Sequence, residues 1–486
     1  MTIQLGAIAD ALRDAGLLTK TTGTLPARAA AITEDSRAVT RGSIFVAVRG
    51  TAGDGHDFLP AAMSAGAVAA IVEDGARTPL PSLVVNDSRA AAAVAAAVAY
   101  GHPARELRLV GVTGTNGKTT TTALLRALLD EESAPAASVG TLGVLLGAAG
   151  ESSPGGAGLT TPGPVELQRV LRALADAGVR TVAMEVSSHS LDQRRVAGLQ
   201  FEAAVFTNLT RDHLDYHGTM ESYFVAKAKL ISYLAPGGVA VVNADEAAWE
   251  ALPPAPRVFS FGRRGDLRVS PVIRHSLAGT EFDLVHEGVA HRVELPLIGE
   301  FNVENAAAAA AAAMQLGVPL RLVAARLAAA PQVSGRLEIL ASDPAIIRDY
   351  AHTPDALERL LKALKPMCAG RLIVVFGCGG DRDRGKRPLM GAIASARADI
   401  AIVTSDNPRT EDPEKIIDDI VAGMTAGEYE RIEDRRAAIE RAIEIADPRD
   451  VVVIAGKGHE TYQVRGTTHY PFDEKEIVSE ILAPSR

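Results

Sequence analysis

A glycine-rich segment that carries a lysine lies between an apolar run at 107–112 and a helix-like stretch at 121–129. Its residues are Gly114, Thr115, Asn116, Gly117, Lys118, Thr119 and Thr120. Backbone N–H groups of such a turn and the start of the following helix bind phosphate groups. Lys118 is placed to reach the β- and γ-phosphates of a nucleoside triphosphate, and the Thr119 hydroxyl is placed to bind Mg²⁺. A glycine turn without a ligand needs neither the lysine nor the tandem threonines.

Two polar segments follow the next buried runs of the chain. Glu185 stands near the end of the run at 181–186, and His213 follows the run at 203–207. A carboxylate at a strand end near a triphosphate is a natural ligand for Mg²⁺, which prefers hard oxygen atoms. An isolated glutamate or histidine there is more often structural. Because the two segments occur together near the lysine turn, we expect them to bind metal or phosphate.

Three loops near the end of the chain also follow apolar runs. They contain Arg382, the sequence Asp-Asn-Pro-Arg at 406–409, and Glu460. Arginine binds a carboxylate through two parallel hydrogen bonds, and a glutamate can hold an ammonium group. The loops therefore predict a pocket for an amino acid, ideally one with a second zwitterionic end. A capped turn is the simpler explanation of Asn-Pro alone.

Composition limits the classes of protein that remain. The chain has 486 residues, of which 47% are hydrophobic and 22% charged, as in a soluble globular protein of about three domains. A net charge of −9 disfavours non-specific binding to nucleic acid or anionic membrane. Only Cys368 and Cys378 are present, so no disulfide framework is expected. No signal peptide and no apolar run of about 18 residues is visible, so we expect a cytoplasmic protein.

The pattern of apolar runs divides the chain at 1–104, 105–331 and 332–486. The middle section alternates strands with helices, which predicts a mostly parallel sheet covered on both faces. Within it we expect a mobile loop at 147–158, short antiparallel strands between 257 and 298, and a helix at the eight alanines 306–313. Strands at 372–376, 400–403 and 451–454 predict a smaller doubly wound third domain.

These motifs together resemble the Mur ligase family, the ATP-dependent ligases that build the peptidoglycan stem peptide. The compact form of the lysine turn at 114–119 is characteristic of these ligases and of their relatives that glutamylate folate, and the resemblance covers essentially the whole chain. It implies an α/β fold with three domains. These are an N-terminal UDP-binding domain, a central P-loop ATPase domain with a parallel sheet, and a C-terminal Rossmann-like domain that binds the amino acid.

The resemblance also implies the sites for ATP and for two Mg²⁺ ions. The first ion lies near Thr119, and the second is held by Glu185, His213 and a carbamate formed on Lys227 by CO₂. Taken alone, Lys227 would be interpreted as a solvated lysine on a helix. Besides residues 114–120, the ATP-binding positions are Asn302 and Asn305 near adenine, and Arg336 and Asp349 of the third domain.

The muramoyl-peptide substrate, UDP-MurNAc-L-Ala-D-Glu, is implied to contact residues of the first two domains. These residues are Ser36, Thr51, Ala52, Gly53, Thr160, Thr161, Ser187, Gln193 and Arg195. The chain departs from some relatives at two positions, one before Asp35 and Ser36 and one before Thr160 and Thr161. Glu34 stands where they have leucine, and Leu159 stands where they have asparagine. No contact is transferred to these two residues.

The amino-acid pocket matches the family members that add meso-diaminopimelate. The matching residues are Arg382, Asp406, Asn407, Pro408, Arg409, Gly456 and Glu460. The implied reaction forms an amide through an acyl phosphate, in a protein that we expect to be a monomer. The alternatives are the same ligase with lysine or ornithine as substrate, and folylpolyglutamate synthetase. From a different class, a regulatory or transport ATPase would use the phosphate site as a switch.

Overall fold

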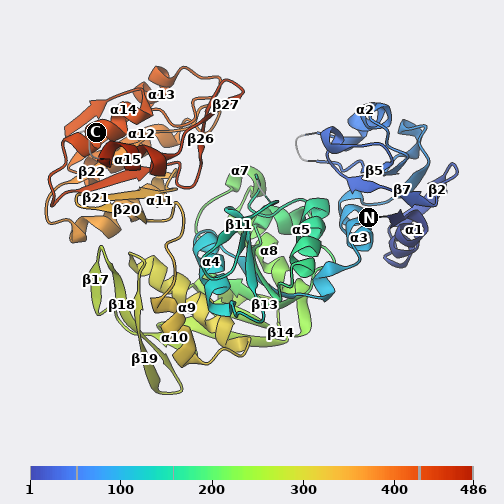
Figure 1. Ribbon diagram of the computed structural model, residues 1–486, viewed down its shortest axis with the longest axis horizontal. Helices are drawn as coiled ribbons and strands as arrows, with labels where there is room; N and C mark the ends of the chain where they lie inside the picture. Colours follow the sequence, from blue (N-terminus) through green and yellow to red (C-terminus); the bar gives the residue numbers. More distant parts are fainter. Residues whose placement is uncertain (1, 51–52, 157, 425–427, 484–486) are drawn as a thin grey trace. The chain divides into compact units, whose positions relative to one another are not determined.

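The computed structural model describes residues 2–50, 53–156, 158–424 and 428–483. The chain forms two compact units. The first consists of Met1–Ser270, Leu284–His291 and Glu304–Leu327, and the second of Pro271–Asp283, Arg292–Val303 and Ala328–Arg486. The five-stranded sheet lies within the first unit and the six-stranded sheet within the second (strands labelled in Figure 1). Among the described residues, no helix combines the length and the apolar character needed to cross a bilayer.

The N-terminal part of the first unit is built around a five-stranded sheet of order β2-β7-β6-β5-β4. Strands β4 to β7 are parallel to their neighbours and β2 is antiparallel to β7. The strands are β2 (Leu18–Thr22), β4 (Ala31–Thr33), β5 (Ser43–Val46), β6 (Ala69–Val72) and β7 (Ser82–Val85). The helices are α1 (Leu5–Asp14), α2 (Leu59–Ser64) and α3 (Ser88–Ala99), and β1 (Ile3–Gln4) pairs with β3 (Arg28–Ala29).

Both faces of this sheet are covered, as its buried side chains show. Ile44 and Val46 pack with α1 and α3, whereas Phe45 between them packs on the other side with α2. Successive side chains of a strand point to opposite faces, so a strand buried throughout needs a helix layer on each side. Helix α3 begins after Asp87, whose carboxylate caps it by accepting a hydrogen bond from the Ala90 N–H.

A larger sheet follows in the same unit, with the order β11-β10-β9-β12-β8-β13-β14-β15-β16. From β9 to β16 all neighbours are parallel. Its parallel strands are β8 (Arg108–Thr113), β9 (Ala136–Gly140), β12 (Thr181–Glu185), β13 (Phe201–Phe206), β14 (Leu234–Asn243), β15 (Arg257–Gly262) and β16 (Leu267–Val269). Its helices are α4 (Lys118–Leu129), α5 (Pro164–Asp176), α6 (Ser188–Asp192), α7 (Leu214–His217), α8 (Met220–Ala228), α9 (Glu300–Gln315) and α10 (Leu320–Ala328).

The structure departs from two expectations for this region. The segment 147–158, expected as a loop, contains β11 (Glu151–Ser153), which pairs antiparallel with β10 (Gly143–Leu146) and so extends the sheet. The run 257–298 begins with β15 and β16, which continue the parallel sheet. The expected antiparallel pairing is confirmed for β17 (Arg274–Ser276) with β18 (Gly279–His286), and β19 (Val289–Leu295) also pairs with β18. Short strands at a sheet edge expose one face, so their sequences lack the apolar runs of the central strands.

The eight alanines 306–313 lie in α9, as predicted, and each has no exposed surface. Alanine combines the highest helix propensity with the smallest Cβ-bearing side chain. This helix can therefore be surrounded closely on all sides. Its first turns carry Asn302 and Asn305.

The second unit contains a six-stranded sheet of order β20-β21-β25-β22-β23-β24. All neighbours are parallel except β20 and β21. The strands are β20 (Glu338–Ser342), β21 (Ala345–Asp349), β22 (Leu372–Phe376), β23 (Ile400–Val403), β24 (Glu428–Arg431) and β25 (Val451–Ala455). Helices α11 (Pro354–Leu364), α12 (Lys386–Arg397) and α13 (Pro413–Val421) pack on one face, and α14 (Arg435–Glu444) and α15 (Glu474–Leu482) on the other. A hairpin of β26 (Tyr462–Arg465) and β27 (Thr468–Pro471) completes the unit. The predicted doubly wound domain is confirmed.

Candidate functional site

The lysine turn lies between β8 and α4, at the carboxyl end of a central strand. Gly114 and Gly117 have positive φ angles of 153° and 86°. A Cβ added to Gly114 would clash with the Thr207 side chain, and one added to Gly117 would clash with the Asn305 side chain. Both positions therefore require glycine. The Lys118 ammonium donates to the carbonyl oxygens of Gly114 at 2.9 Å and Thr115 at 2.8 Å, which curls the lysine over its own turn.

Lys227 of α8 lies against the same turn. Its ammonium nitrogen donates to the Gly114 carbonyl oxygen at 2.7 Å and stands 4.5 Å from the centre of the Tyr223 ring. The residue is 1% exposed. Burial first, and then the charge of Lys118, hold the pKa of Lys227 well below its usual value. The alternative of a solvated helix lysine is therefore wrong.

His213 belongs to a cluster of aromatic rings beside these lysines. Its ring centre lies 4.9 Å from that of His189, which also contacts Tyr216 at 4.3 Å and His217 at 5.4 Å. Burial lowers the pKa of His213, and Lys118 and Lys227 lower it further, although Asp212 opposes them. Burial lowers the pKa of His189 to about 4. The rings are therefore neutral near pH 7, so their nitrogens can accept hydrogen bonds or bind a metal.

Glu185 ends β12 and is 1% exposed. It pairs in register with Val112 of β8, so it lies on the strand next to the lysine turn. Its carboxylate accepts hydrogen bonds from the Thr141 N–H at 2.8 Å and the Thr141 hydroxyl at 3.2 Å. Within the described ranges, no group of three or more His, Cys, Asp or Glu side chains is spaced to hold a metal ion. The structure thus brings Lys118, Lys227 and His213 together and places Glu185 on the adjoining strand.

A hydrogen-bonded network links Glu185 to residues that the resemblance assigns to the muramoyl peptide. The Thr161 hydroxyl donates to the Glu185 carbonyl oxygen at 2.9 Å and accepts from the Ser187 N–H at 3.1 Å. Thr160 accepts from the Thr141 hydroxyl at 3.3 Å. Arg195 then donates to the Thr161 carbonyl oxygen at 2.9 Å.

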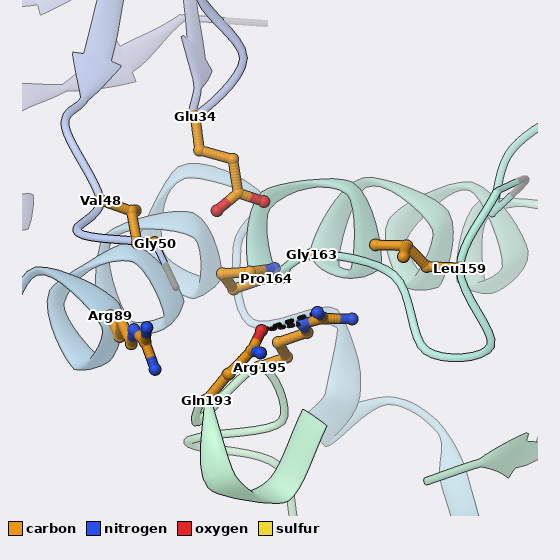
Figure 2. A pocket seen from close by; sticks show the side chains of 9 residues that line it. All are labelled: Glu34, Val48, Gly50, Arg89, Leu159, Gly163, Pro164, Gln193 and Arg195. Carbon is orange, nitrogen blue, oxygen red and sulfur yellow. Dashed lines mark hydrogen bonds between the residues drawn. The ribbon is translucent and has the colours of Figure 1, made fainter. Parts of the chain in front are cut away.

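Gln193 and Arg195 line a pocket of about 210 Å³ in the first unit (Figure 2). The Arg195 guanidinium donates twice to the Gln193 side-chain oxygen, at 2.7 and 3.1 Å. The pocket is lined by Glu34, Val48, Gly50, Arg89, Leu159, Gly163, Pro164, Gln193 and Arg195. Both positions at which the chain departs from some relatives, Glu34 and Leu159, therefore lie in this pocket.

The other residues predicted for the UDP end lie near Glu34 or Gly50 in the sequence. Ser36 begins a 3₁₀ helix, Ser36–Ala38, directly after β4. The Gly53 carbonyl oxygen accepts from the N–H of Gly50, a lining residue of the pocket, at 2.9 Å. Thr51 and Ala52 lie outside the described residues.

The second unit brings together the three loops predicted to bind an amino acid. They follow β22, β23 and β25, which are neighbours in the sheet. The Asn407 side chain donates to the Glu460 carboxylate at 3.0 Å. Arg409 has a φ angle of 51° and donates to the Gly380 carbonyl oxygen at 2.8 Å. Arg382 lies nearby, since a Cβ on Gly379 would stand 2.9 Å from an Arg409 nitrogen and 3.8 Å from the Arg382 side chain.

Lys457 holds these loops together, and the sequence did not single it out. Its side chain has no exposed surface. The ammonium donates to the Asn407 side-chain oxygen and to the Tyr462 carbonyl oxygen, each at 2.9 Å. It also lies 3.3 Å from the Asp406 carboxylate and 3.6 Å from that of Glu460. Gly456, just before it, has a φ angle of 120°, which favours glycine. Pro408 completes the turn between Asn407 and Arg409.

The remaining predicted ATP-binding residues have internal partners. The Asp349 carboxylate accepts from the N–H groups of Leu337 and Ala351, each at 2.8 Å, and burial raises its pKa although Arg336 opposes this. The Arg336 guanidinium lies 4.7 Å above the Tyr350 ring. The buried Asn302 donates to the Ile298 carbonyl oxygen at 2.8 Å. Asn305 lies against Gly117 of the lysine turn.

Comparisons with known proteins agree with this arrangement. Residues 29–112 match the profile "Mur ligase family, catalytic domain", residues 112–313 the "Mur ligase middle domain", and residues 335–458 the "Mur ligase, glutamate ligase domain". A protein of Gloeobacter violaceus is 46% identical over 471 residues, which cover 94% of each chain. The chain belongs to the Mur ligase family. A relative from Aquifex aeolicus is 41% identical over 459 residues and 94% of each chain.

Both relatives of this Mur ligase are named UDP-N-acetylmuramoyl-L-alanyl-D-glutamate–2,6-diaminopimelate ligase. A solved structure of the same name is 35% identical, has a TM-score of 0.67 and covers 99% of each chain. Folylpolyglutamate synthase from Mycobacterium tuberculosis shares the fold, with 22% identity and a TM-score of 0.59 over 76% of this chain and 92% of its own. The predicted α/β fold with three Mur ligase domains is confirmed.

Proposed function

We propose that the protein joins meso-diaminopimelate to the D-glutamate γ-carboxylate of UDP-MurNAc-L-Ala-D-Glu, with conversion of ATP to ADP and phosphate. The observation that supports this best is the convergence of Asn407, Arg409 and Glu460 in one set of loops of the second unit. Arginine suits the carboxylate of the distal end of diaminopimelate and Glu460 suits its ammonium. The names of relatives that are 41–46% identical agree with this substrate.

The reaction proceeds in two steps that conserve atoms and charge. A γ-carboxylate oxygen attacks the γ-phosphorus of ATP, the bond to the β-γ bridging oxygen breaks, and ADP leaves. The diaminopimelate amine then attacks the acyl carbon, the bond to the phosphate oxygen breaks, and phosphate and one proton are released. Lys118 stabilises the negative charge on the transferring group, and the N–H groups of the turn hold the phosphates. The Thr160–Thr161–Arg195 network positions the acid.

Lys227 is suited to carry a carbamate. Burial and the charge of Lys118 hold its pKa well below the usual value, which raises the share of neutral amine, and a neutral amine attacks CO₂ to give a carbamate anion and a proton. The carbamate anion would attract Lys118, whereas the ammonium form of Lys227 repels it. Together with Glu185, His213 and Thr119, it would supply oxygen and nitrogen ligands for two Mg²⁺ ions, which would neutralise charge on the phosphates. Asn302, Asn305, Arg336 and Asp349 are proposed to hold the nucleotide.

We further propose a cytoplasmic monomer whose domains span 1–104, 105–331 and 332–486.

One experiment separates this activity from two alternatives, a ligase that adds lysine or ornithine and a regulatory ATPase. Release of ADP from purified protein should require both the muramoyl dipeptide and a diamino acid, with meso-diaminopimelate preferred over lysine and ornithine. Equal rates with lysine would reassign the amino-acid pocket. ADP release without either co-substrate would indicate a regulatory ATPase instead.

A further inference from the structure

The Glu34 carboxylate lies at the beginning of helix α5, which belongs to another part of the first unit. Glu34 follows β4, and its carboxylate lies against Gly163, the residue that precedes α5, because a Cβ on Gly163 would clash with it. Val165 lies in the first turn of α5, and its backbone N–H lowers the pKa of Glu34. Gly163 has no side chain to cap the helix, so the Glu34 carboxylate is the acidic group that lies against this helix start.

The same pocket carries two arginines. Arg195 and Arg89 line it together with Glu34 (Figure 2). The hydrogen bonds of Arg195 to Thr161 and Gln193 fix the position of its guanidinium. A helix N-terminus and two guanidinium groups attract an anion. In the free protein the anion at this place is Glu34 itself.

The charged form of Glu34 is only partly stabilised there. Burial raises its pKa to about 7, while Arg195 and the Val165 N–H oppose the rise and the neighbouring Asp35 adds to it. Burial and Arg89 lower the pKa of Arg195, whereas Glu34 and Tyr216 raise it. Glu34 can therefore change protonation near neutral pH when the charge around it changes.

We propose that Glu34 occupies, in the free protein, the anion position of this pocket, and that an anionic group of the substrate takes this position while Glu34 binds a proton. The inference rests on the proposed function, because that function assigns the pocket to the UDP-muramoyl substrate. The incoming anion is either the diphosphate or a carboxylate of the substrate. Neither group titrates between pH 6 and 8, so any proton taken up in this pH range binds to the protein and not to the substrate.

Isothermal titration calorimetry with UDP-MurNAc-L-Ala-D-Glu, without ATP, measures this proton directly. Titrations in two buffers that differ in ionisation enthalpy give the number of protons bound per ligand. At pH 7 we expect uptake of about 0.5 proton by the wild type and about none by the Glu34→Gln variant, since a group with a pKa of about 7 is half ionised there. The wild-type Kd should rise about tenfold from pH 6 to pH 8, whereas that of the variant should stay constant.

A matched control and a second ligand sharpen the test. Asp74 caps a 3₁₀ helix by accepting from the Ala76 N–H and is not among the residues lining the pocket. Asp74→Asn should therefore keep the wild-type proton uptake. Uptake with UDP-N-acetylglucosamine, whose diphosphate is esterified at both ends and so does not titrate near pH 7, would identify the diphosphate as the incoming anion, and uptake only with the full substrate would identify a carboxylate.

Equal proton uptake by wild type and Glu34→Gln, or its loss in Asp74→Asn, would overturn the assignment of Glu34. A failure of the proposed function gives a different result. In that case neither UDP-N-acetylglucosamine nor the muramoyl dipeptide would bind the wild type at any pH, and the inference would fall with the function.

Discussion

Replacing Lys457 by methionine should destabilise the second unit more than any surface change. Methionine fills a similar volume but removes the charge that lies 3.3 Å from the Asp406 carboxylate and two hydrogen bonds of 2.9 Å. Asp406 is 7% exposed, so water cannot replace the lost cation. Breaking a buried ion pair by removing one partner costs about 3–5 kcal/mol. Backbone N–H groups of β22 and β25 should then exchange with deuterium roughly 100- to 4000-fold faster, where they exchange through unfolding of the unit.

Lys475→Met provides the matched control. Lys475 also pairs with a carboxylate, that of Glu338 at 3.3 Å, but its side chain is 63% exposed. Such a pair contributes at most about 1 kcal/mol, so exchange in β22 and β25 should change less than about sixfold. Similar exchange rates in the two variants would refute the argument that Lys457 is an internal cation on which the amino-acid loops depend.

The stability of Lys457→Met should also depend on pH in a defined direction. Burial raises the pKa of Asp406, but Lys457 and Arg435 lower it by more, so this pKa lies below its usual value. A carboxyl group with a lowered pKa stabilises the fold above its unfolded-state pKa, and this contribution is lost as the pH falls through the folded-state pKa. Without Lys457 the pKa of Asp406 rises, so the difference in stability between wild type and variant should shrink on acidification below about pH 4.

Three further predictions concern the reaction. Lys118→Ala should lower kcat by at least about 10²- to 10³-fold without changing the melting temperature, and near-normal ATP consumption would contradict its role. Arg409→Ala should raise the KM for diaminopimelate roughly 10- to 150-fold and leave the KM for ATP nearly unchanged, as measured by initial rates, because it loses a charge-assisted pair worth about 1.5–3 kcal/mol. Protein equilibrated with ¹³C-bicarbonate should show a carbamate carbon resonance that is absent from Lys227→Ala, and its presence in that variant would place the modification elsewhere.

Much of the fold could be predicted from local patterns, because buried parallel strands are continuous apolar runs. The apolar runs at 107–112 and 372–376 predict β8 and β22 to within one residue of their bounds. The edge strands β11 and β24 were missed, since one exposed face removes the apolar run. The continuation of the parallel sheet through β15 depends on pairing with β14, which no local pattern encodes.

The candidate site also combines features that local sequence predicts with features that only the structure shows. The glycines of the lysine turn predict its conformation, because their φ angles exclude most other residues. The burial of Lys227 and Lys457 depends on segments more than 40 residues away, Gly114 and Asn407, and so could not be predicted from their neighbours. The position of Glu34 in a pocket beside Arg195 likewise could not be predicted from the sequence. The sequence showed only that glutamate stands where some relatives have leucine.

Transfer of oxygen from substrate to phosphate tests the central claim, that ATP activates the bound acid directly. UDP-MurNAc-L-Ala-D-Glu labelled with ¹⁸O in the D-glutamate γ-carboxylate is incubated with the protein, ATP and diaminopimelate, and the released phosphate is analysed by mass spectrometry. An acyl phosphate intermediate predicts one ¹⁸O atom in each phosphate formed with the amide product. Phosphate that carries no ¹⁸O while amide accumulates would show that the acid is not phosphorylated, and would contradict the mechanism.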